Sequence, residues 1–229
     1  MTTLRCGAVL FDLDGVLADS TANVERHWRT WAAGHGLDGD AIMRVVHGRR
    51  AVESIPMLAP GLDVAREMFA LEAAEAGDTD GVLPVPGAAA LLSRLPPGAW
   101  AIVTSGTRAV ATARLRRVGI LVPPVLVTAD DVRHGKPHPE GYLAAAAALG
   151  VPPARCVVVE DTPPGIAAAH AGGMRAIGVA TTYPAERLAE AEAVAGRLAD
   201  IEVEASPDGI RLTVGQGERG RLVEDAPPR

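Results

Sequence analysis

Five short runs of apolar residues recur along the chain, and helical patterns separate most of them. Each run is continuously apolar rather than alternating, which is typical of strands in a parallel sheet covered on both faces. The first run starts at Ala8 and ends in two carboxylates; the others are Trp100–Thr104, Val125–Thr128, Cys156–Glu160 and Ala176–Val179. The alternation predicts an α/β fold: a doubly wound parallel sheet with right-handed crossovers.

The segments between these runs carry signals that begin and end helices. The helices predicted over Arg108–Val118 and Pro139–Leu149 are each followed by a glycine, the usual residue after a helix C-terminus. Pro163–Ala171 follows Thr162, a suitable N-cap, and has proline at its first position. A fourth helix is predicted over Pro86–Leu95.

The interval from residue 19 to residue 83 interrupts this alternation. It holds no convincing strand, and its apolar residues, such as Val24, Trp28 and Trp31, recur at helical spacing. We therefore expect an all-helical cap inserted directly after the first strand. The expected division is a discontinuous core over 1–18 and 84–217, a cap over 19–83, and a flexible tail over 218–229.

A small hairpin is predicted near the end of the chain. Ile201–Glu204 and Ile210–Val214 flank Ser-Pro-Asp-Gly, which is a turn sequence. The tail after the hairpin is mostly polar and ends in Pro-Pro-Arg, so we expect it to be frayed.

Composition excludes several classes of partner. The chain has 229 residues, of which 48% are hydrophobic and 22% charged, as in an ordinary globular protein. The net charge is −6, and no run of Lys and Arg resembles a nucleic-acid patch, so nucleic acid is not an expected partner. No apolar run is long enough to span a bilayer, and the first residues lack a secretory signal. Cys6 and Cys156 are expected to be free, buried thiols, and the expected location is the cytoplasm.

Four of the five predicted strands lead into a polar motif. The motifs are Asp12-Leu-Asp14-Gly15, Thr104-Ser105-Gly106, the loop of residues 128–139 that contains Lys136, and Glu160-Asp161. Because ligands of open parallel sheets bind outside the carboxyl ends of the strands, we expect these motifs to meet in space.

The residue types suit a phosphate and a divalent cation. Two carboxylates roughly 4 Å apart repel each other by about 4 kcal/mol at an effective dielectric near 20, so Asp12 and Asp14 call for a nearby cation or a raised pKa. With Glu160 and Asp161 they offer the hard oxygen ligands that Mg²⁺ prefers. Taken singly, each of these acids also fits a turn or the first turn of a helix.

The other two motifs suit phosphate oxygens. Thr104, with the backbone N–H groups of Ser105 and Gly106 at a helix start, forms a concavity rich in donors. The Lys136 ammonium could neutralise a phosphate and a nearby carboxylate. An ordinary N-cap and a solvent-facing lysine are the alternatives for each motif alone.

In their order along the chain, these motifs resemble the four motifs of the haloacid-dehalogenase (HAD) superfamily. The match rests on Asp12-Leu-Asp14-Gly15, Thr104 after an apolar run, Lys136-Pro137, and Glu160-Asp161 followed by Gly165. It extends from about residue 7 to residue 182. Finer stretches resemble sugar phosphatases and the yeast-type glycerol-3-phosphate and 2-deoxyglucose-6-phosphate phosphatases. The resemblance implies a Rossmann-like core with a helical cap.

The resemblance also implies a role for each site residue. Asp12 would be the nucleophile that forms an aspartyl-phosphate, and Asp14 the general acid and base. Mg²⁺ would be held by Asp12, the Asp14 carbonyl and Asp161, with Glu160 bound directly or through water. Thr104, Ser105, Gly106 and Lys136 would bind the phosphoryl group. In the cap, Arg50 or Arg49 would contact the substrate.

The predicted function is therefore a Mg²⁺-dependent phosphatase acting on small phosphate monoesters: sugar, polyol or glycerol phosphates. The main alternative is a phosphomutase of the β-phosphoglucomutase type. In that family a cap histidine commonly follows the nucleophile by about a dozen positions, where this chain has Val24. A non-enzymatic phospho-acceptor module is a further alternative. The expected partner is a small-molecule phosphate ester, and the expected state is a monomer or weak homo-oligomer.

Overall fold

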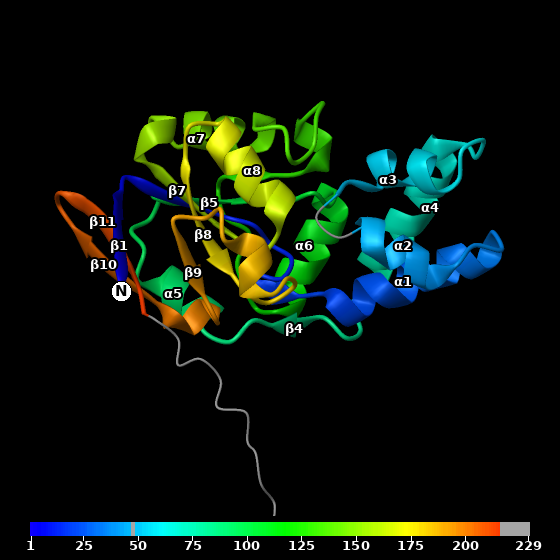
Figure 1. The fold of residues 1–229 in the computed structure, drawn as a ribbon, viewed down its shortest axis with the longest axis horizontal. Helices are drawn as coiled ribbons and strands as arrows, with labels where there is room; N and C mark the ends of the chain where they lie inside the picture. Colours follow the sequence, from blue (N-terminus) through cyan, green and yellow to red (C-terminus); the bar gives the residue numbers. More distant parts are fainter. Residues whose placement is uncertain (47–48, 216–229) are drawn as a thin grey trace, which may run out of the picture.

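A six-stranded parallel sheet forms the centre of this computed structural model, which describes residues 1–46 and 49–215. The strand order is β6-β5-β2-β7-β8-β9, and every neighbouring pair is parallel (Figure 1). The strands are β2 (Ala8–Phe11), β5 (Trp100–Val103), β6 (Leu126–Val127), β7 (Cys156–Glu160), β8 (Arg175–Val179) and β9 (Ala193–Ala195). The predicted parallel α/β sheet is thus confirmed, and β9 is an edge strand that sequence analysis missed.

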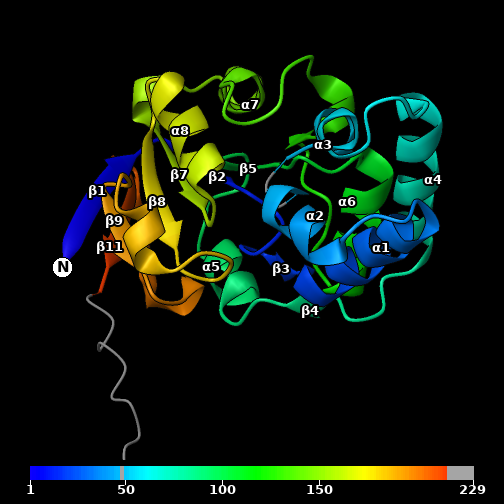
Figure 2. The same ribbon diagram turned by 45° about the vertical axis from the view of Figure 1, so that its right-hand side comes forward.

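The sheet is buried on both faces, which explains the continuously apolar runs. Along β2, Val9 and Phe11 face one hydrophobic cluster, and Ala8 and Leu10 face the other. Helices α5 (Ala88–Ser93) and α6 (Arg108–Arg117) cover the first face, and α7 (Glu140–Ala148) and α8 (Pro163–Ala171) cover the second (Figure 2). These are the four predicted helices. In the described part of the chain, no helix is both long and apolar enough to cross a bilayer.

The strand order places a ligand crevice at the end of β2. From β2 the chain continues to β5 and β6 on one side, and it later returns to the opposite side of β2 at β7. The helices change face at the same place. In open α/β sheets, the carboxyl ends of strands at such a switch point are where ligands bind. Asp12 directly follows β2 and therefore lies at this crevice.

A second, antiparallel sheet lies at the end of the molecule away from the helical insertion (Figure 1). The predicted hairpin is present as β10 (Ile201–Ser206) and β11 (Gly209–Val214). Sequence analysis missed its third strand, β1 (Thr2–Cys6), which pairs with β11. Only Leu4 and Cys6 of β1 are buried, so its apolar signal is weak. Short 3-10 helices occur at Ala129–Asp131, Pro153–Arg155, Ala185–Leu188 and Leu198–Asp200.

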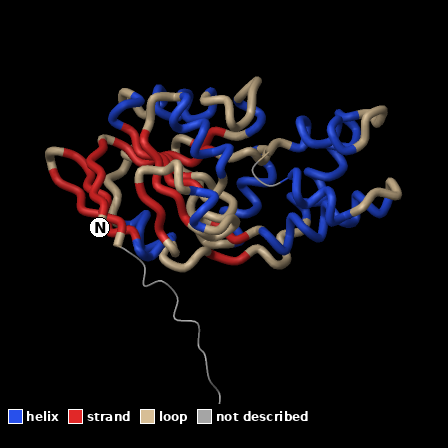
Figure 3. The backbone as a smooth tube through the Cα atoms, viewed as in Figure 1, coloured by secondary structure: helices blue, strands red, loops and turns tan. Residues whose placement is uncertain are grey.

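Four helices follow β2 and form a body with its own hydrophobic core (Figure 3). They are α1 (Thr21–Gly34), α2 (Gly39–Val46), α3 (Ala51–Leu58) and α4 (Val64–Gly77). Their apolar faces meet around Trp28, Trp31 and Ile55, and the two tryptophan rings pack edge to face with centroids 5.5 Å apart. The predicted tail, residues 218–229, lies outside the described residues, as do His47 and Gly48.

Two paired segments connect the helical body to the sheet. The chain leaves through β3 (Ala18–Asp19) and returns through β4 (Leu83–Pro84), and these two strands pair antiparallel. Asn23 lies fully buried beside them, and its Nδ2 donates hydrogen bonds to the carbonyl oxygens of Asp78 (2.7 Å) and Asp80 (3.1 Å). The Asn23 amide therefore fixes the returning segment against α1.

Replacing Asn23 with alanine is expected to loosen this connection. Two carbonyls would lose their hydrogen bonds, at a cost of roughly 1–3 kcal/mol in the free energy of unfolding. Urea unfolding would measure that cost, and amide hydrogen exchange should rise within residues 78–82. Thr30→Ala is the matched control, since Thr30 is exposed on the same helix and bonds only within it. Equal exchange in the two variants would contradict the assigned role.

Candidate active site

A cavity of about 100 Å³ lies between the carboxyl ends of the central strands and the helical body. From the sheet side it is lined by Asp12, Asp14, Ser105, Gly106 and Asp161, and from the helical side by residues that include Arg49 and Glu75. The cavity thus collects three of the four predicted motifs. Residues of the fourth, around Lys136, line an adjoining pocket.

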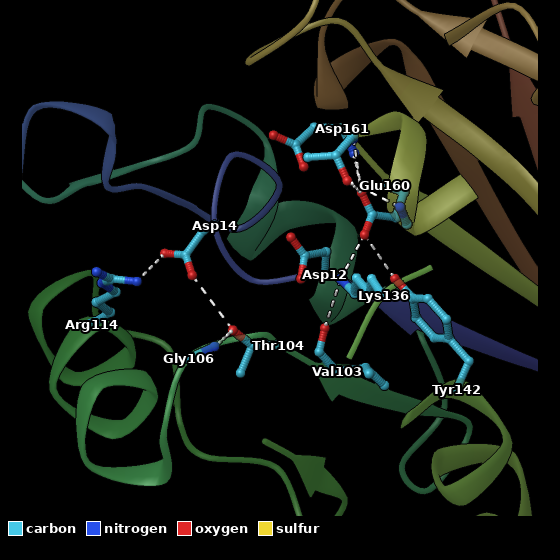
Figure 4. Close-up of polar contacts among 12 residues, drawn as sticks. Asp12, Asp14, Val103, Thr104, Gly106, Arg114, Lys136, Tyr142, Glu160 and Asp161 are labelled. Atoms are coloured by element: carbon cyan, nitrogen blue, oxygen red, sulfur yellow. Dashed lines mark hydrogen bonds and ion pairs between the residues drawn. The ribbon is translucent and has the colours of Figure 1, made fainter. Parts of the chain in front are cut away.

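Lys136 joins the first motif to the last. Its Nζ lies 2.7 Å from Oδ1 of Asp12 and 2.6 Å from Oε1 of Glu160, and all three side chains are buried (Figure 4). Burial disfavours the ammonium, but the two carboxylates outweigh it and raise the pKa of Lys136 well above its usual value. Lys136 is also the only lysine in the sequence. This site therefore places an ammonium, stabilised in its charged form, between two acids.

Both oxygens of Glu160 are occupied by protein donors. Oε1 accepts from Lys136 and from the hydroxyl of Tyr142 (3.0 Å). Oε2 accepts from the backbone N–H groups of Asp161 (2.9 Å) and Thr162 (2.8 Å), and from the Thr162 hydroxyl (2.9 Å). In this geometry Glu160 positions Lys136. Tyr142 was missed by sequence analysis because nothing near it in the chain points to Glu160.

Two glycines allow the acidic side chains to lie against the backbone. A Cβ on Gly165 would overlap the Glu160 carboxylate, and a Cβ on Gly15 would overlap that of Asp161. Gly15 also has a φ of +77°, a conformation that other residues rarely adopt. The glycines of the first and last motifs are therefore required by close approach.

The acids at the end of β2 and β7 fit a divalent cation. Asp12, Glu160 and Asp161 offer carboxylate oxygens that all lie within 4.8 Å of one another. Oδ1 of Asp161 is buried and has no hydrogen-bond partner in the described part of the chain. Burial raises the pKa of Asp12 to about 7; Lys136 opposes the shift, while Glu160 and Asp14 add to it. Burial, Glu160 and Asp12 also raise the pKa of Asp161. A hard cation such as Mg²⁺ would relieve this excess of acids.

Asp14 lies apart from this cluster and points the other way. Its Oδ1 accepts hydrogen bonds from the Ser20 hydroxyl (2.6 Å) and from Nη1 of Arg114 (2.9 Å). Its Oδ2 lies 3.5 Å from the Thr104 hydroxyl. Arg114 was not predicted as a site residue, although its position carries a signal: it shares the buried face of α6 with Val110, one helical turn before it.

The loop after β5 presents the predicted phosphate-binding residues. Thr104 is buried, and its Oγ1 accepts a hydrogen bond from the N–H of Gly106 (3.1 Å). Ser105 and Gly106 line the cavity beside Asp12. The Gly106 N–H is therefore directed at the Thr104 hydroxyl oxygen. Ser105, Gly106 and Thr107, which precede α6, face the cavity.

Arg50, one of the two arginines predicted to contact substrate, is not among the residues that line this cavity; it lines the adjoining pocket together with Ser105 and Lys136. The residue is 7% exposed, and its guanidinium pairs with Glu53 and donates to the carbonyl oxygens of Val132 (3.1 Å) and Arg133 (2.8 Å). Arg50 therefore connects the helical body to the loop that carries Lys136 through these hydrogen bonds. Arg49, the other candidate in the same turn, is exposed and lines the cavity.

Comparison with known proteins identifies the family. Residues 6–173 match the family model of haloacid dehalogenase-like hydrolases. The chain is 43% identical over 211 residues to hexitol phosphatase A of Escherichia coli, an alignment that covers 90% of this chain and 98% of that protein. It is 38% identical over 204 residues to glycerol-1-phosphate phosphohydrolase 2 of Saccharomyces cerevisiae, covering 82% and 80% of the two chains. The chain belongs to the haloacid dehalogenase-like hydrolase family, within its sugar-phosphatase branch.

The fold occurs among solved structures. A β-phosphoglucomutase from Clostridium difficile superimposes with a TM-score of 0.72, covering 86% of this chain and 93% of that one. Its sequence identity is 24%, so this likeness concerns the fold alone. Similar proteins are named for phosphate transfer and for phosphate release. The fold therefore does not determine which of the two reactions occurs, and the reaction has to be inferred from the residues of the site.

Mg²⁺ is expected to stabilise the protein more at pH 8 than at pH 5. Asp12 has a folded pKa of about 7 against an ordinary value of 3.8, so between these values the folded state binds more protons than the unfolded state. The metal-free protein therefore loses stability as pH rises through this window, and a cation that binds the ionised acids restores it. At a hundred times its Kd the ion should add about 2.7 kcal/mol, or roughly 5–10 °C in Tm.

Calorimetry in Mg²⁺ or EDTA at the two pH values would measure this difference. Asp161→Asn removes one of the three clustered carboxylates and should abolish the gain. A Tm increase of equal size at both pH values, or one that survives in the variant, would contradict the assignment.

Proposed function

We propose that this protein is a Mg²⁺-dependent phosphatase that hydrolyses small phosphate monoesters of sugars, polyols or glycerol through an aspartyl-phosphate. The observation that carries the proposal is the buried contact between Lys136 and Asp12 at the end of β2, beside the unpartnered oxygen of Asp161. The names of the related phosphatases support the substrate class.

Asp12 is the proposed nucleophile. Its Oδ1 is held by Lys136, which leaves Oδ2 to attack phosphorus. The attack forms a bond between Asp12 and phosphorus and breaks the bond from phosphorus to the ester oxygen. Asp14, held away from the acidic cluster, gives its proton to the departing alkoxide and then removes a proton from the water that hydrolyses the intermediate.

The phosphoryl group is strongly anionic, so catalysis consists mainly of positioning and charge neutralisation. Thr104, Ser105 and Gly106, in the loop between β5 and α6, would bind its oxygens, together with Lys136. Mg²⁺ held by Asp12, Asp161 and the Asp14 carbonyl, with Glu160 bound directly or through water, would supply positive charge at the attacking carboxylate.

We further propose that residues 19–83 act as a cap over the core of residues 1–18 and 84–217. The paired segments β3 and β4 support this division, since the chain crosses between the two bodies only there. Closing the cap would exclude water and bring cap residues to the leaving group. The substrate is then a small-molecule phosphate ester, and a cytoplasmic location remains a prediction from the sequence.

Hydrolysis is favoured over phosphomutase activity by the residue at position 24. Val24 lines the cavity, and its apolar side chain cannot transfer a proton. Supplying β-glucose 1-phosphate should therefore release inorganic phosphate without forming glucose 6-phosphate. Multiple turnovers on 4-nitrophenyl phosphate would also separate an enzyme from a module that only accepts a phosphoryl group.

Substitution of the nucleophile tests the proposal directly. Asp12→Asn should remove Mg²⁺-dependent phosphate release while the far-UV circular dichroism stays unchanged, because an amide is a poor nucleophile of nearly equal size. Asp208→Asn in the exposed hairpin turn is the matched control. Turnover by the Asp12 variant close to that of the wild type would remove the basis of the mechanism.

Substitution of the acid–base residue should have a graded effect. Asp14→Asn is expected to lower kcat on an alkyl phosphate by about 10² or more, the usual scale of general acid–base help. Steady-state kinetics on glycerol phosphate and sugar phosphates would measure it. A change confined to KM would argue against a role in proton transfer.

A further inference from the structure

Arg114 is a buried cation that none of the proposed chemical steps uses. It belongs to α6, on the sheet side of the molecule, and its side chain is 4% exposed. Nη1 lies 2.9 Å from Oδ1 of Asp14, and Nη2 lies 2.6 Å from Oε2 of Glu75. In Figure 4, Arg114 approaches Asp14 from the side away from Asp12 and Lys136.

Among the described residues, the hydrogen-bond partners of this guanidinium are these two carboxylates. Its Nε is buried and has no hydrogen-bond partner among the described residues. Glu75 is itself buried, at 8% exposure, on α4 of the cap. Because Asp14 belongs to the core and Glu75 to the cap, the full set of contacts exists only while the cap occupies this position.

The geometry also distinguishes the two oxygens of Asp14. Ser20 and Arg114 both bind Oδ1. Oδ2 is left on the side of Thr104, 3.5 Å from its hydroxyl, and so faces the proposed phosphoryl-binding loop. Arg114 and Ser20 together hold Oδ1 and leave Oδ2 directed at the proposed position of the ester.

We propose that Arg114 is a positioning residue that couples the placement of the cap, through Glu75, to the orientation of Asp14. This inference rests on the proposed function, since it assigns Asp14 to proton transfer. With the cap in place, Glu75 holds the guanidinium and the guanidinium holds Oδ1, so that Oδ2 faces the leaving group. When the cap moves away, Glu75 leaves and Arg114 loses one of its two anchors. Proton delivery is then efficient only over a covered substrate.

A comparison of leaving groups separates positioning from general structural support. An alkyl phosphate needs a proton on its departing oxygen, whereas 4-nitrophenyl phosphate leaves as a stable phenolate and needs it far less. The quantity to compare is kcat/KM on glycerol phosphate and on 4-nitrophenyl phosphate, because kcat/KM reports the steps up to and including phosphoryl transfer to Asp12. Arg114→Gln should lower the alkyl-to-aryl ratio at least tenfold.

Glu75→Gln tests the link to the cap. It keeps the size of the side chain but removes the charge that anchors Nη2, so the ratio should fall in the same direction. The double variant should have a ratio no lower than that of Arg114→Gln alone, because the two residues act through one chain of contacts. Arg116→Gln, two residues along the same helix and exposed, is the matched control and should leave the ratio unchanged.

Equal losses on both substrates would overturn the inference, since they would show that Arg114 only supports the structure. A normal ratio in Glu75→Gln would overturn the coupling to the cap. If Arg114→Gln does not fold, the alkyl-to-aryl ratio of Glu75→Gln alone tests the inference. Failure of the wild type to release phosphate from any ester would instead reject the proposed function itself.

Discussion

The contact between the Lys136 ammonium and the carboxylates of Asp12 and Glu160 is the interaction on which the rest of the site depends. Oxygens of three carboxylates lie within 4.8 Å of one another at the buried ends of two neighbouring strands, where unpaired charges are costly. One ammonium at 2.6–2.7 Å offsets part of that charge, and hydrogen bonds from Tyr142 and the backbone stabilise Glu160. A divalent cation would neutralise the remaining negative charge. The electrostatic design of the site therefore follows from placing acids at the ends of two adjacent parallel strands.

Much of this arrangement was predictable from the sequence, because the rules that govern it are local or topological. Continuously apolar runs identify buried parallel strands, and the carboxyl ends of such strands meet at one edge, so Asp12, Lys136, Glu160 and Asp161 could be brought together in advance. Side chains that approach from distant elements could not. Arg50 is held by carbonyl groups more than eighty residues away, and Tyr142 reaches Glu160 from a helix whose sequence is mostly alanine. Strands β1 and β9 lie at sheet edges, and neither is continuously buried, so neither gives the continuous apolar run by which the other strands of the parallel sheet were predicted.

Two arginines join the helical body to the sheet, and they reach across in opposite directions. Arg50 extends from the helical side to carbonyls of the loop that carries Lys136, and Arg114 extends from the sheet side to Glu75. The Arg50 contact is to the loop of Lys136, which is proposed to bind phosphate, and Arg114 also binds Asp14, which is proposed to transfer the proton. The planar guanidinium suits this task, since it can bind two acceptors at once in a fixed geometry. The helical body therefore contacts both the loop that carries Lys136 and the arginine that binds Asp14.

The presence of a single lysine has a practical consequence. All other basic side chains of this chain are arginines or histidines, so the exterior offers no ε-amino group to acylating or aldehyde reagents. The one ε-amino group is enclosed, protonated and paired with acids, which protects it from such reagents. Amine-directed dyes, resins and crosslinkers thus have no lysine to attach to on the folded protein. Modification of a lysine would accordingly report that the strand ends around Asp12 have come apart.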